Sequence, residues 1–294
     1  MRYYVSTIRR FQTYAVTRIF PCRAHSCIGN PLADCRHIRF HVFGNERRAA
    51  SSHDAAKLAA IDAALVSFVA IHRRLPCPAN GTLTAGTEMF GTQDDPCSNQ
   101  AGGVVPWVAL GLSAADIEDG WATRITYRMD PYLARDGAMD MSLCDPAGTG
   151  TPTTTGAPPR AKCAVAVGTC TASDLSKCVS PTSFLAGKGI EIRDSKNGTV
   201  LMNPAATPSS GAAYVLISHG ENRAGGYGDS GQLLASVKSV EGANETQNRA
   251  DASNTHYVDA PQRFSDDAGR FDDFVIRPTV ISVIQRAHLG PRSH

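Results

Sequence analysis

An alanine-rich segment closed by two prolines limits most strongly what this chain can fold into. The segment from His53 to Arg74 reads HDAAKLAAIDAALVSFVAIHRR, and its larger apolar side chains recur at the spacing of one helix face. These side chains are Leu58, Ile61, Leu65, Phe68 and Val69. The pattern predicts a helix over 53–74 that buries one face, with Ser51, Ser52 or Asp54 capping its start.

The end of this helix is also predicted from the sequence. Pro76 has no amide hydrogen and disfavours helical geometry at Leu75, and Pro78 repeats the block two residues later. Residues 76–120 are rich in Gly, Pro, Asn and Asp, which predicts a long ordered loop with a short helical turn around Ser113–Ile117.

Short strands are expected in the rest of the chain. Candidates begin at Arg124 (RITYRMD, alternating like a half-buried strand), Cys163 (CAVAV), Gly189 (GIEIRD), Thr199 (TVLM), Ala213 (AYVLISH) and Phe271 (FDDFVIR). Residues 148–160 read as a flexible low-complexity insertion, and 221–267 as a polar loop. One helix followed by short strands with hairpin-length gaps predicts an α+β domain, with the helix packed on an antiparallel sheet.

Charge is distributed unevenly along the chain. The net charge is +2, but residues 1–52 contain nine Arg and two acidic residues, which leaves 20 basic and 25 acidic residues after them. The apolar pieces of this basic leader are cut by Arg and are shorter than the roughly 20 residues of a membrane-spanning helix. The body has no basic patch with interleaved aromatics, so we expect no nucleic-acid partner.

Six of the nine cysteines lie after the leader, at Cys77, Cys97, Cys144, Cys163, Cys170 and Cys178. None belongs to a C-x-x-C pair, and an even number in a body rich in Gly and Pro favours disulfides in an oxidising compartment. Several pairings are open. Short loops favour Cys77–Cys97, Cys144–Cys163 and Cys170–Cys178, and six reduced thiols are the alternative.

Three stretches occur in a characteristic order. The first is RLPCPANG at the helix end, followed by GTE at Gly86, Cys97 and GGVVPWVALGL at Gly102. The second is DGWATRITYRMD at Asp119, and the third joins AYVLISHGENRAGGYGD at Ala213 to FDDFVI at Phe271. With these stretches, residues 53–285 resemble the bacterial type IV pilin and type II secretion pseudopilin superfamily, with Ala122 where a glycine is usual.

This resemblance implies a pilin-like N-terminal helix packed on an antiparallel sheet, with long loops pinned by disulfides, over residues 53–285. It implies a non-enzymatic subunit of a type II secretion pseudopilus or a type IV pilus-like fibre, in the cell envelope or periplasm. Its partners would be other pilin or pseudopilin subunits and the inner-membrane assembly platform. Residues 286–294 are expected to form a C-terminal tail.

The first 52 residues depart from the superfamily pattern. Its members begin with a Gly-Phe-Thr-Leu-x-Glu processing site and about 20 apolar residues that continue into the helix and anchor it in the membrane. Residues 1–52 contain neither feature. We therefore expect this leader to be disordered or the product of a wrong start or a frame shift, and the chain as written to be soluble and monomeric.

The same resemblance implies a calcium site at Asp272 and Asp273, completed by oxygens of the Gly-rich loop before them. Calcium takes six to eight hard oxygen ligands, so both carboxylates and the loop would be needed. In that loop Asn222 and Arg223 replace the usual Asp-Gly, and an arginine is unfavourable beside a cation. Without calcium, the two aspartates would only border an edge strand. No other cofactor is expected.

A catalytic interpretation would rest on His219 and Glu221, near Ser218 at a strand end. No Gly-x-Ser-x-Gly elbow occurs and no Asp is clearly placed to orient the histidine, so we expect no catalytic residues. The alternative function is a secreted disulfide-bonded hydrolase or carbohydrate-binding protein. A further alternative takes the Arg-rich leader as an organelle-targeting segment.

Two other residue pairs are expected to have structural roles. Trp107 and Trp121 should pack the loop onto the helix and the sheet, and Asp119 should pair with Arg124 at the entry of the first long strand.

If the leader results from a shifted reading frame, the DNA upstream of the codon for His53 should encode the missing segment in another frame. We expect a Gly-Phe-Thr-x-x-Glu site followed by an apolar helix continuous with residues 53–74. Sequencing and translating this region in all frames tests the idea, which fails if no frame contains that segment.

Overall fold

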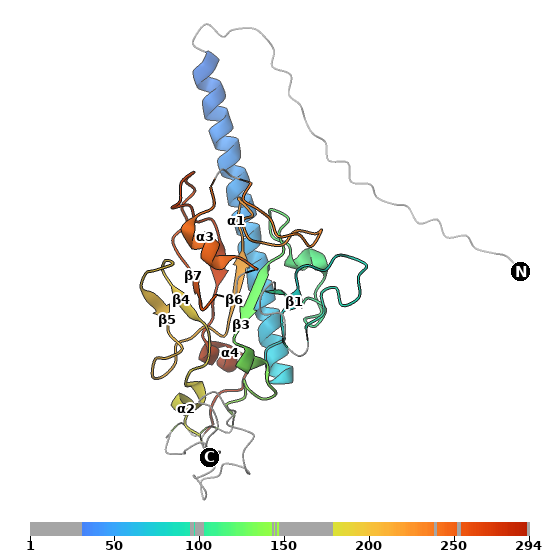
Figure 1. Ribbon diagram of the computed structural model, residues 1–294, viewed down its shortest axis with the longest axis vertical. Helices are drawn as coiled ribbons and strands as arrows, with labels where there is room; N and C mark the ends of the chain where they lie inside the picture. The colour runs from blue at the N-terminus through green and yellow to red at the C-terminus, as the bar shows by residue number, and fades with distance from the viewer. Residues whose placement is uncertain are drawn as a thin grey trace, which may run out of the picture. The chain divides into compact units, whose positions relative to one another are not determined.

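The computed structural model describes residues 31–94, 97, 103–142, 144, 146, 179–237, 240–251 and 254–292, with side chains of the first helix from Ser52 on. Within these residues the chain is α+β, as expected, with a long helix, a five-stranded antiparallel sheet and a second sheet of three strands (Figure 1). Residues 1–30, the insertion at 148–160 and the strand expected at Cys163 lie outside the described residues. By its internal contacts the chain divides into the units Met1–Asn45 and Glu46–His294.

Helix α1 spans Pro31–His72. The predicted N-terminal cap at residues 51–54 is therefore wrong, because these residues continue a helical backbone, and the Asp54 carboxylate accepts a hydrogen bond from the Gly120 amide instead. The helix ends two residues earlier than expected. Arg73 takes a left-handed conformation (φ +56°) and donates its amide to the Val69 carbonyl at 2.8 Å, which is a common way to close a helix.

The segment Ser52–His72 of α1 is long and apolar enough to cross a membrane, judged by length and composition. The core helix of a soluble domain meets the same requirement. Here one face of the segment is buried, through Leu58, Ile61, Leu65 and Val69, each at most 2% exposed.

The larger sheet has the strand order β1-β2-β3-β6-β8, and every neighbouring pair is antiparallel. Its strands are β1 (Ala79–Asn80), β2 (Gly103–Val104), β3 (Thr126–Met129), β6 (Tyr214–Ser218) and β8 (Phe274–Ile276). The centre is the pair β3 and β6, in which Thr126 lies opposite Ile217. β3, β6 and β8 lie within three of the predicted strand segments, whereas β1 and β2 lie in the segment predicted as a loop.

The smaller sheet has the order β5-β4-β7, formed by β4 (Glu191–Arg193), β5 (Val200–Met202) and β7 (His256–Val258). This sheet combines an antiparallel pair, β4 and β5, with a parallel pair, β4 and β7, and it was not predicted as a separate sheet. The short helices η1 (Ala114–Ile117), η2 (Pro131–Ala134), α2 (Pro181–Leu185), α3 (Ala243–Asn248) and α4 (Val280–Arg286) complete the described elements. Of these, only η1 was predicted.

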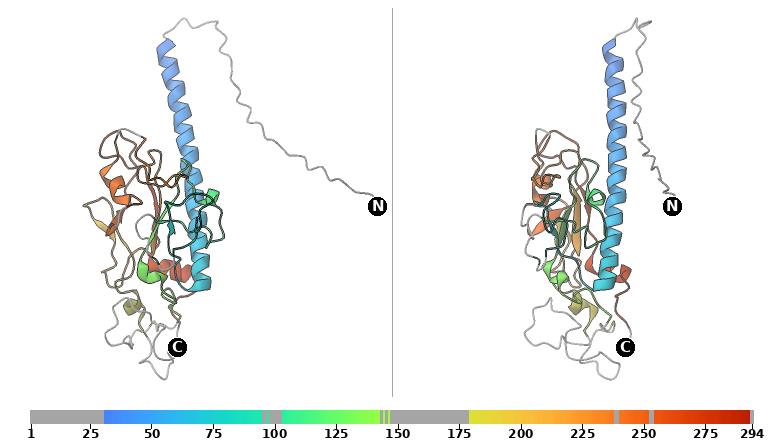
Figure 2. Two further views of the ribbon diagram at one scale, coloured as in Figure 1. Left: turned by 45° about the vertical axis from the view of Figure 1, so that its right-hand side comes forward. Right: turned by 90° about the vertical axis from the view of Figure 1, so that its right-hand side faces the viewer.

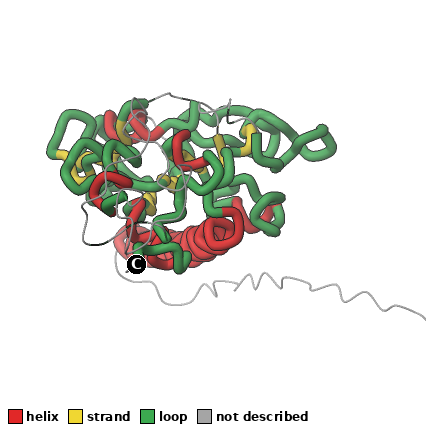
Figure 3. Tube along the Cα trace, turned by 90° about the horizontal axis from the view of Figure 1, so that it is seen from below, coloured by secondary structure: helices red, strands yellow, loops and turns green. Residues whose placement is uncertain are grey.

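The central strands are buried on both faces. Tyr127 and Leu216 pack with Leu58 and Leu65 of α1, which runs along one side of the sheet in both views of Figure 2. On the opposite face, Ile217 packs with residues of the smaller sheet and its surroundings, namely Ile192, Met202 and Tyr257. The prediction that β3 is half-buried is therefore wrong, since even Thr126 and Arg128 are at most 2% exposed. Viewed from below, much of the chain beside α1 is loop (Figure 3).

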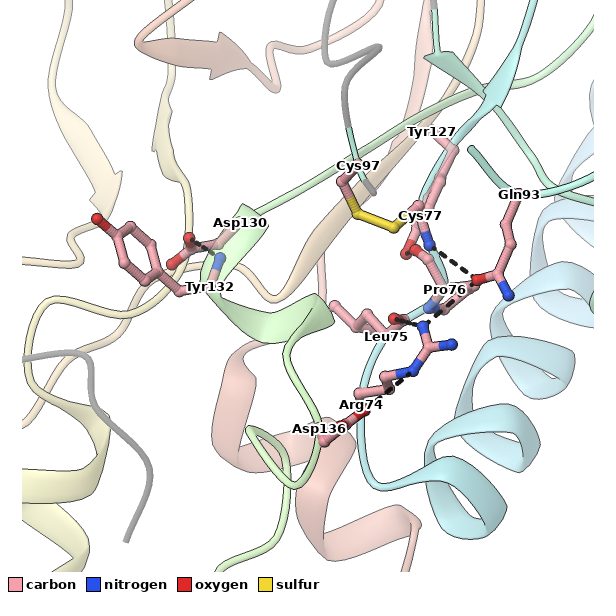
Figure 4. Close-up of a disulfide and its surroundings, with 10 residues drawn as sticks. All are labelled: Arg74, Leu75, Pro76, Cys77, Gln93, Cys97, Tyr127, Asp130, Tyr132 and Asp136. Atoms are coloured by element: carbon pink, nitrogen blue, oxygen red, sulfur yellow. Dashed lines mark hydrogen bonds and ion pairs between the residues drawn. A yellow bond between two sulfur atoms is a disulfide. The ribbon is translucent and has the colours of Figure 1, made fainter. Parts of the chain in front are cut away.

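The loop after α1 contains the expected disulfide between Cys77 and Cys97, with a Cα–Cα distance of 5.1 Å (Figure 4). Polar contacts hold the loop on both sides of the sulfur bridge. Gln93 Oε1 accepts from the Cys77 amide and from Arg74 Nη1, both at 3.3 Å, and the Tyr127 hydroxyl donates to the Pro76 carbonyl at 3.1 Å. The proline stop is thus attached directly to β3.

The other expected pairings are not tested. Cys144 is buried and forms a backbone bridge with Val179, while Cys163, Cys170 and Cys178 lie outside the described residues.

The chain after α4 packs on the body where a tail was expected. Ala287 and Leu289 are 4% and 8% exposed, and the Leu289 carbonyl accepts from the Met141 amide at 2.9 Å.

Replacing Cys77 and Cys97 together by serine should lower the free energy of unfolding by about 3 kcal/mol, the loop-closure value for a loop of this length. Urea unfolding of the double variant against the parent measures this loss, and peptide mapping under non-reducing conditions checks the pairing. An unchanged unfolding midpoint, or a peptide that joins either cysteine to a different one, would contradict the assignment.

Candidate functional site

Three buried carboxyl groups meet just before the start of β8. Asp272 and Asp273 immediately precede this strand and are 0% and 3% exposed. The third, Glu245 of α3, is also fully buried, and one carboxylate oxygen from each residue lies within 4.8 Å of the others. Sequence analysis missed Glu245 because residues 221–267 read as a loop. A detectable signal was Glu three residues after Gly242, the spacing of a helix N-terminus with a Glu at its third position.

The loop after β6 returns to this cluster through a tight turn. Gly220 has φ +59°, and a Cβ at this position would lie 2.3 Å from the Asp272 carbonyl oxygen, so a glycine is required. Two residues on, Asn222 donates its amide to Asp272 Oδ2 at 3.0 Å and its side chain to Glu245 Oε2 at 2.7 Å. The Gly-rich loop therefore supplies N–H donors to the carboxylates.

A positively charged side chain, that of Arg270, also lies among these three carboxyl groups. Arg270 is 2% exposed, and its Nη2 lies 2.6 Å from Asp272 Oδ2 and 3.4 Å from Glu221 Oε2. The arginine that the sequence places in the Gly-rich loop, Arg223, is directed elsewhere: it donates to the Ala122 carbonyl and the Thr123 hydroxyl. The positive charge among these carboxylates thus comes from a residue that the sequence pattern did not single out.

The donor set fits calcium only in part. Among the described residues, Asp272 Oδ1 and Asp273 Oδ1 are buried oxygens without a hydrogen-bond partner, so a cation would find two carboxylate oxygens available. Calcium takes six to eight oxygens. Both Glu245 oxygens accept backbone or amide N–H groups, from Asp272, Gly242 and Asn222. Calcium at Asp272 and Asp273 therefore stays a prediction.

Burial keeps part of this cluster protonated. Burial, with the neighbouring Glu245 carboxylate, raises the pKa of Asp272 to about 7 against the opposing effect of Arg270. Burial also raises the pKa of Asp273 well above its ordinary value. Together with Arg270, these protons limit the negative charge that the fold must bury.

Thr126, His219 and Asp273 form a row in which only the first two side chains are hydrogen-bonded to each other. His219 Nε2 is 2.8 Å from the Thr126 hydroxyl, and its Nδ1 is 3.9 Å from Asp273 Oδ1. The order of groups is that of a nucleophile, a histidine and an orienting carboxylate. However, Thr126 and His219 are fully buried, and burial lowers the pKa of His219 to about 3. No edge of this histidine is exposed to a substrate. Among the contacts described, neither Ser218 nor Glu221 hydrogen-bonds its ring.

A second pair of buried carboxyl groups joins α1 to the sheet. Ser218 Oγ lies 2.9 Å from Asp54 Oδ2 and 2.9 Å from Asp119 Oδ2. Asp119 therefore does not pair with Arg124 as expected. The Arg124 guanidinium instead donates to the carbonyls of Gly81, Leu83 and Asp229.

The two tryptophans have the packing roles expected of them. Trp107 is 4% exposed and meets Phe90 edge-on at a centroid distance of 4.7 Å. Trp121 is half-buried and stacks on Phe274 of β8 at 6.2 Å.

The chain matches no protein-family model, no curated protein and no solved structure.

Replacing Arg270 by glutamine should lower the free energy of unfolding by about 3–5 kcal/mol, because the Asp272 carboxylate would lose its buried counter-charge. Urea unfolding at pH 7.5 measures the loss.

The matched control is Arg263→Gln, since Arg263 pairs with Asp267 on the surface, where both side chains are more than half exposed. This variant should lose less than about 1 kcal/mol. Equal effects of the two substitutions would contradict the role of Arg270.

A large rise in the unfolding temperature of the unmodified chain with added Ca²⁺, reversed by a chelator, would favour calcium at Asp272 and Asp273.

Proposed function

We propose that this chain is a structural, non-enzymatic subunit of a type II secretion pseudopilus or a type IV pilus-like fibre. The observation that carries the proposal is a long helix whose second half packs across an antiparallel sheet and ends in a loop pinned by a disulfide. The three motif stretches that resemble the pilin and pseudopilin superfamily fall on this helix end, on the entry to β3, and on β6 and β8.

The exposed face of α1 supports an assembly role. Between Ala55 and Ala70 this face contains mainly small side chains, among them Ala59, Ala63 and Ser67. Small residues allow helices to approach closely. In the proposed fibre this face packs against the corresponding helix of neighbouring subunits, and the loops and the smaller sheet point outward.

The disulfide supports an oxidising location. A Cys77–Cys97 bridge is expected to persist in the periplasm or cell envelope, where thiols are not kept reduced. The partners in this proposal are other pilin or pseudopilin subunits and an inner-membrane assembly platform.

The alternative, a secreted disulfide-bonded hydrolase or carbohydrate-binding protein, has less support. Its best candidate is the row of Thr126, His219 and Asp273, and all three side chains are buried. If this row were catalytic, His219→Ala would abolish hydrolysis of some substrate in a broad panel. In a fibre subunit the same change affects only stability.

A chimaera tests the assembly proposal. A prepilin leader and its apolar half-helix are joined in helical register ahead of His53 and expressed in a bacterium that has a type II secretion or type IV pilus machinery. We expect the peptidase to process the chimaera and the product to appear in sheared surface fibres, detected by immunoblotting.

Two helix variants separate folding from assembly. Ser67→Glu places a charge on the exposed face of α1 and should reduce incorporation at least tenfold while leaving the unfolding midpoint of the body unchanged. Leu65→Glu places a charge in the core and should prevent folding itself. A processed and folded chimaera that never enters fibres would refute the proposed function.

A further inference from the structure

The contact between Asp54, Ser218 and Asp119 contains more acceptors than hydrogens. A serine hydroxyl has one hydrogen and donates it to one partner at a time. Ser218 Oγ lies at hydrogen-bond distance from a carboxylate oxygen of each aspartate, and all three side chains are at most 5% exposed. If both carboxyl groups were ionised, one of them would face the lone pairs of the hydroxyl oxygen. A single added proton removes this conflict, because the protonated carboxyl group then donates to Ser218 while Ser218 donates to the other.

The remaining oxygens of the two carboxyl groups tie separate elements together. Asp54 Oδ1 accepts from the Gly120 amide at 2.6 Å, and Asp119 Oδ1 accepts from the amides of Trp121 and Thr123 at 2.9 and 2.8 Å. Through these bonds α1, the turn at 119–123 and the end of β6 meet at one point. A change in the charge of this pair therefore acts directly on how the helix is held.

Among the described residues that face Asp54 and Asp119, no buried cation compensates the negative charge of the two carboxyl groups. From α1, His53 Nδ1 lies 3.8 Å from Asp54 Oδ1, but its side chain is 54% exposed. Lys57, one helical turn further on, donates its ammonium to the carbonyls of Ala115 and Glu118. The turn contributes Glu118, whose carboxyl group hydrogen-bonds the Asp229 carboxyl group, and β6 contributes only Ser218. This differs from the cluster at Asp272, where Arg270 lies within the site.

We propose that Asp54, Ser218 and Asp119 form a proton-dependent clamp, which holds α1 on the sheet while the two carboxyl groups share one proton and loosens when that proton leaves to solvent. The clamp depends only on this geometry and holds whether or not the chain forms fibres. In a fibre subunit it would make the attachment of the stem helix to the body sensitive to periplasmic pH.

The direction of the pH dependence follows from burial. Burial raises the pKa of Asp119 to about 6, and it also raises the pKa of Asp54. A carboxyl group whose pKa is raised on folding keeps its proton to higher pH than the unfolded chain does. Its contribution is therefore fully present below the ordinary pKa near 4 and is lost as the pH rises through about 6. The clamp is closed at mildly acidic pH and loosened above neutrality.

Hydrogen exchange at the clamped amides tests the proposal in the full chain. We expect the protection factors of the Gly120, Trp121 and Thr123 amides, corrected for intrinsic exchange rates, to fall at least tenfold between pH 5 and pH 7.5. In Asp119→Asn, whose amide oxygen still accepts from Trp121 and Thr123, they should change less than about threefold, because one titrating group is removed. A pH-independent wild type, or a variant with the wild-type pH dependence, would overturn the clamp.

Two further measurements keep the test decisive. His53→Gln removes the nearest titrating side chain outside the pair and should leave the pH dependence intact; its loss in this variant would assign the effect to His53 and overturn the proposal. If Asp119→Asn does not fold, a carboxyl ¹³C NMR titration of the unmodified chain replaces it. At least one of the two aspartates should then titrate near pH 6, and titration of both below about pH 4.5 would refute the clamp.

Discussion

The contact between α1 and the β3–β6 face of the larger sheet is the constraint on which the rest of the structure depends. Leu58, Ile61 and Leu65 present a continuous apolar stripe to the strands, and each is at most 2% exposed. Full burial of such a side chain contributes about 1.5–3 kcal/mol. The polar side chains on the inner side of the helix are satisfied at the same contact. Asp62 accepts from the Tyr214 hydroxyl at 2.7 Å and pairs with Arg286 of α4, so the helix, the sheet and the C-terminal segment are joined together.

The opposite face of the larger sheet is covered less simply. Beside the small apolar cluster around Ile217 lie Arg128 and His219, buried among loops. Burying such groups is costly unless each finds a partner. Arg128 Nη2 donates to the carbonyl of Ala250, which follows α3, and His219 Nε2 hydrogen-bonds the Thr126 hydroxyl of β3. The two clusters of buried carboxyl groups are stabilised in different ways. Asp272 pairs with the buried Arg270, whereas Asp54 and Asp119 share the hydroxyl of Ser218.

Local patterns predicted the elements that depend on neighbouring residues. The spacing of Leu58 to Val69 identified the buried face of α1, and the two prolines placed its end within two residues of the observed one. β3, β4, β5, β6 and β8 lie within predicted strand segments. The Cys77–Cys97 pair was favoured because its loop is short. The start of α1 was placed too late, at residues 51–54. The strands β1, β2 and β7 were missed because they lie in the polar segments 76–120 and 221–267, which read as loop.

The sequence by itself determined the fold class, the buried face and the end of α1, and the positions of Asp272 and Asp273 before an edge strand. Each follows from spacing, proline geometry or side-chain polarity within a short stretch. Only the tertiary structure decided which carboxyl groups meet. Asp54 and Asp119 share Ser218 across separations of 164 and 99 residues, and Glu245 joins Asp272 from a segment that read as loop. The energy of a buried charge depends on every neighbour within several ångströms, and no local pattern contains that information.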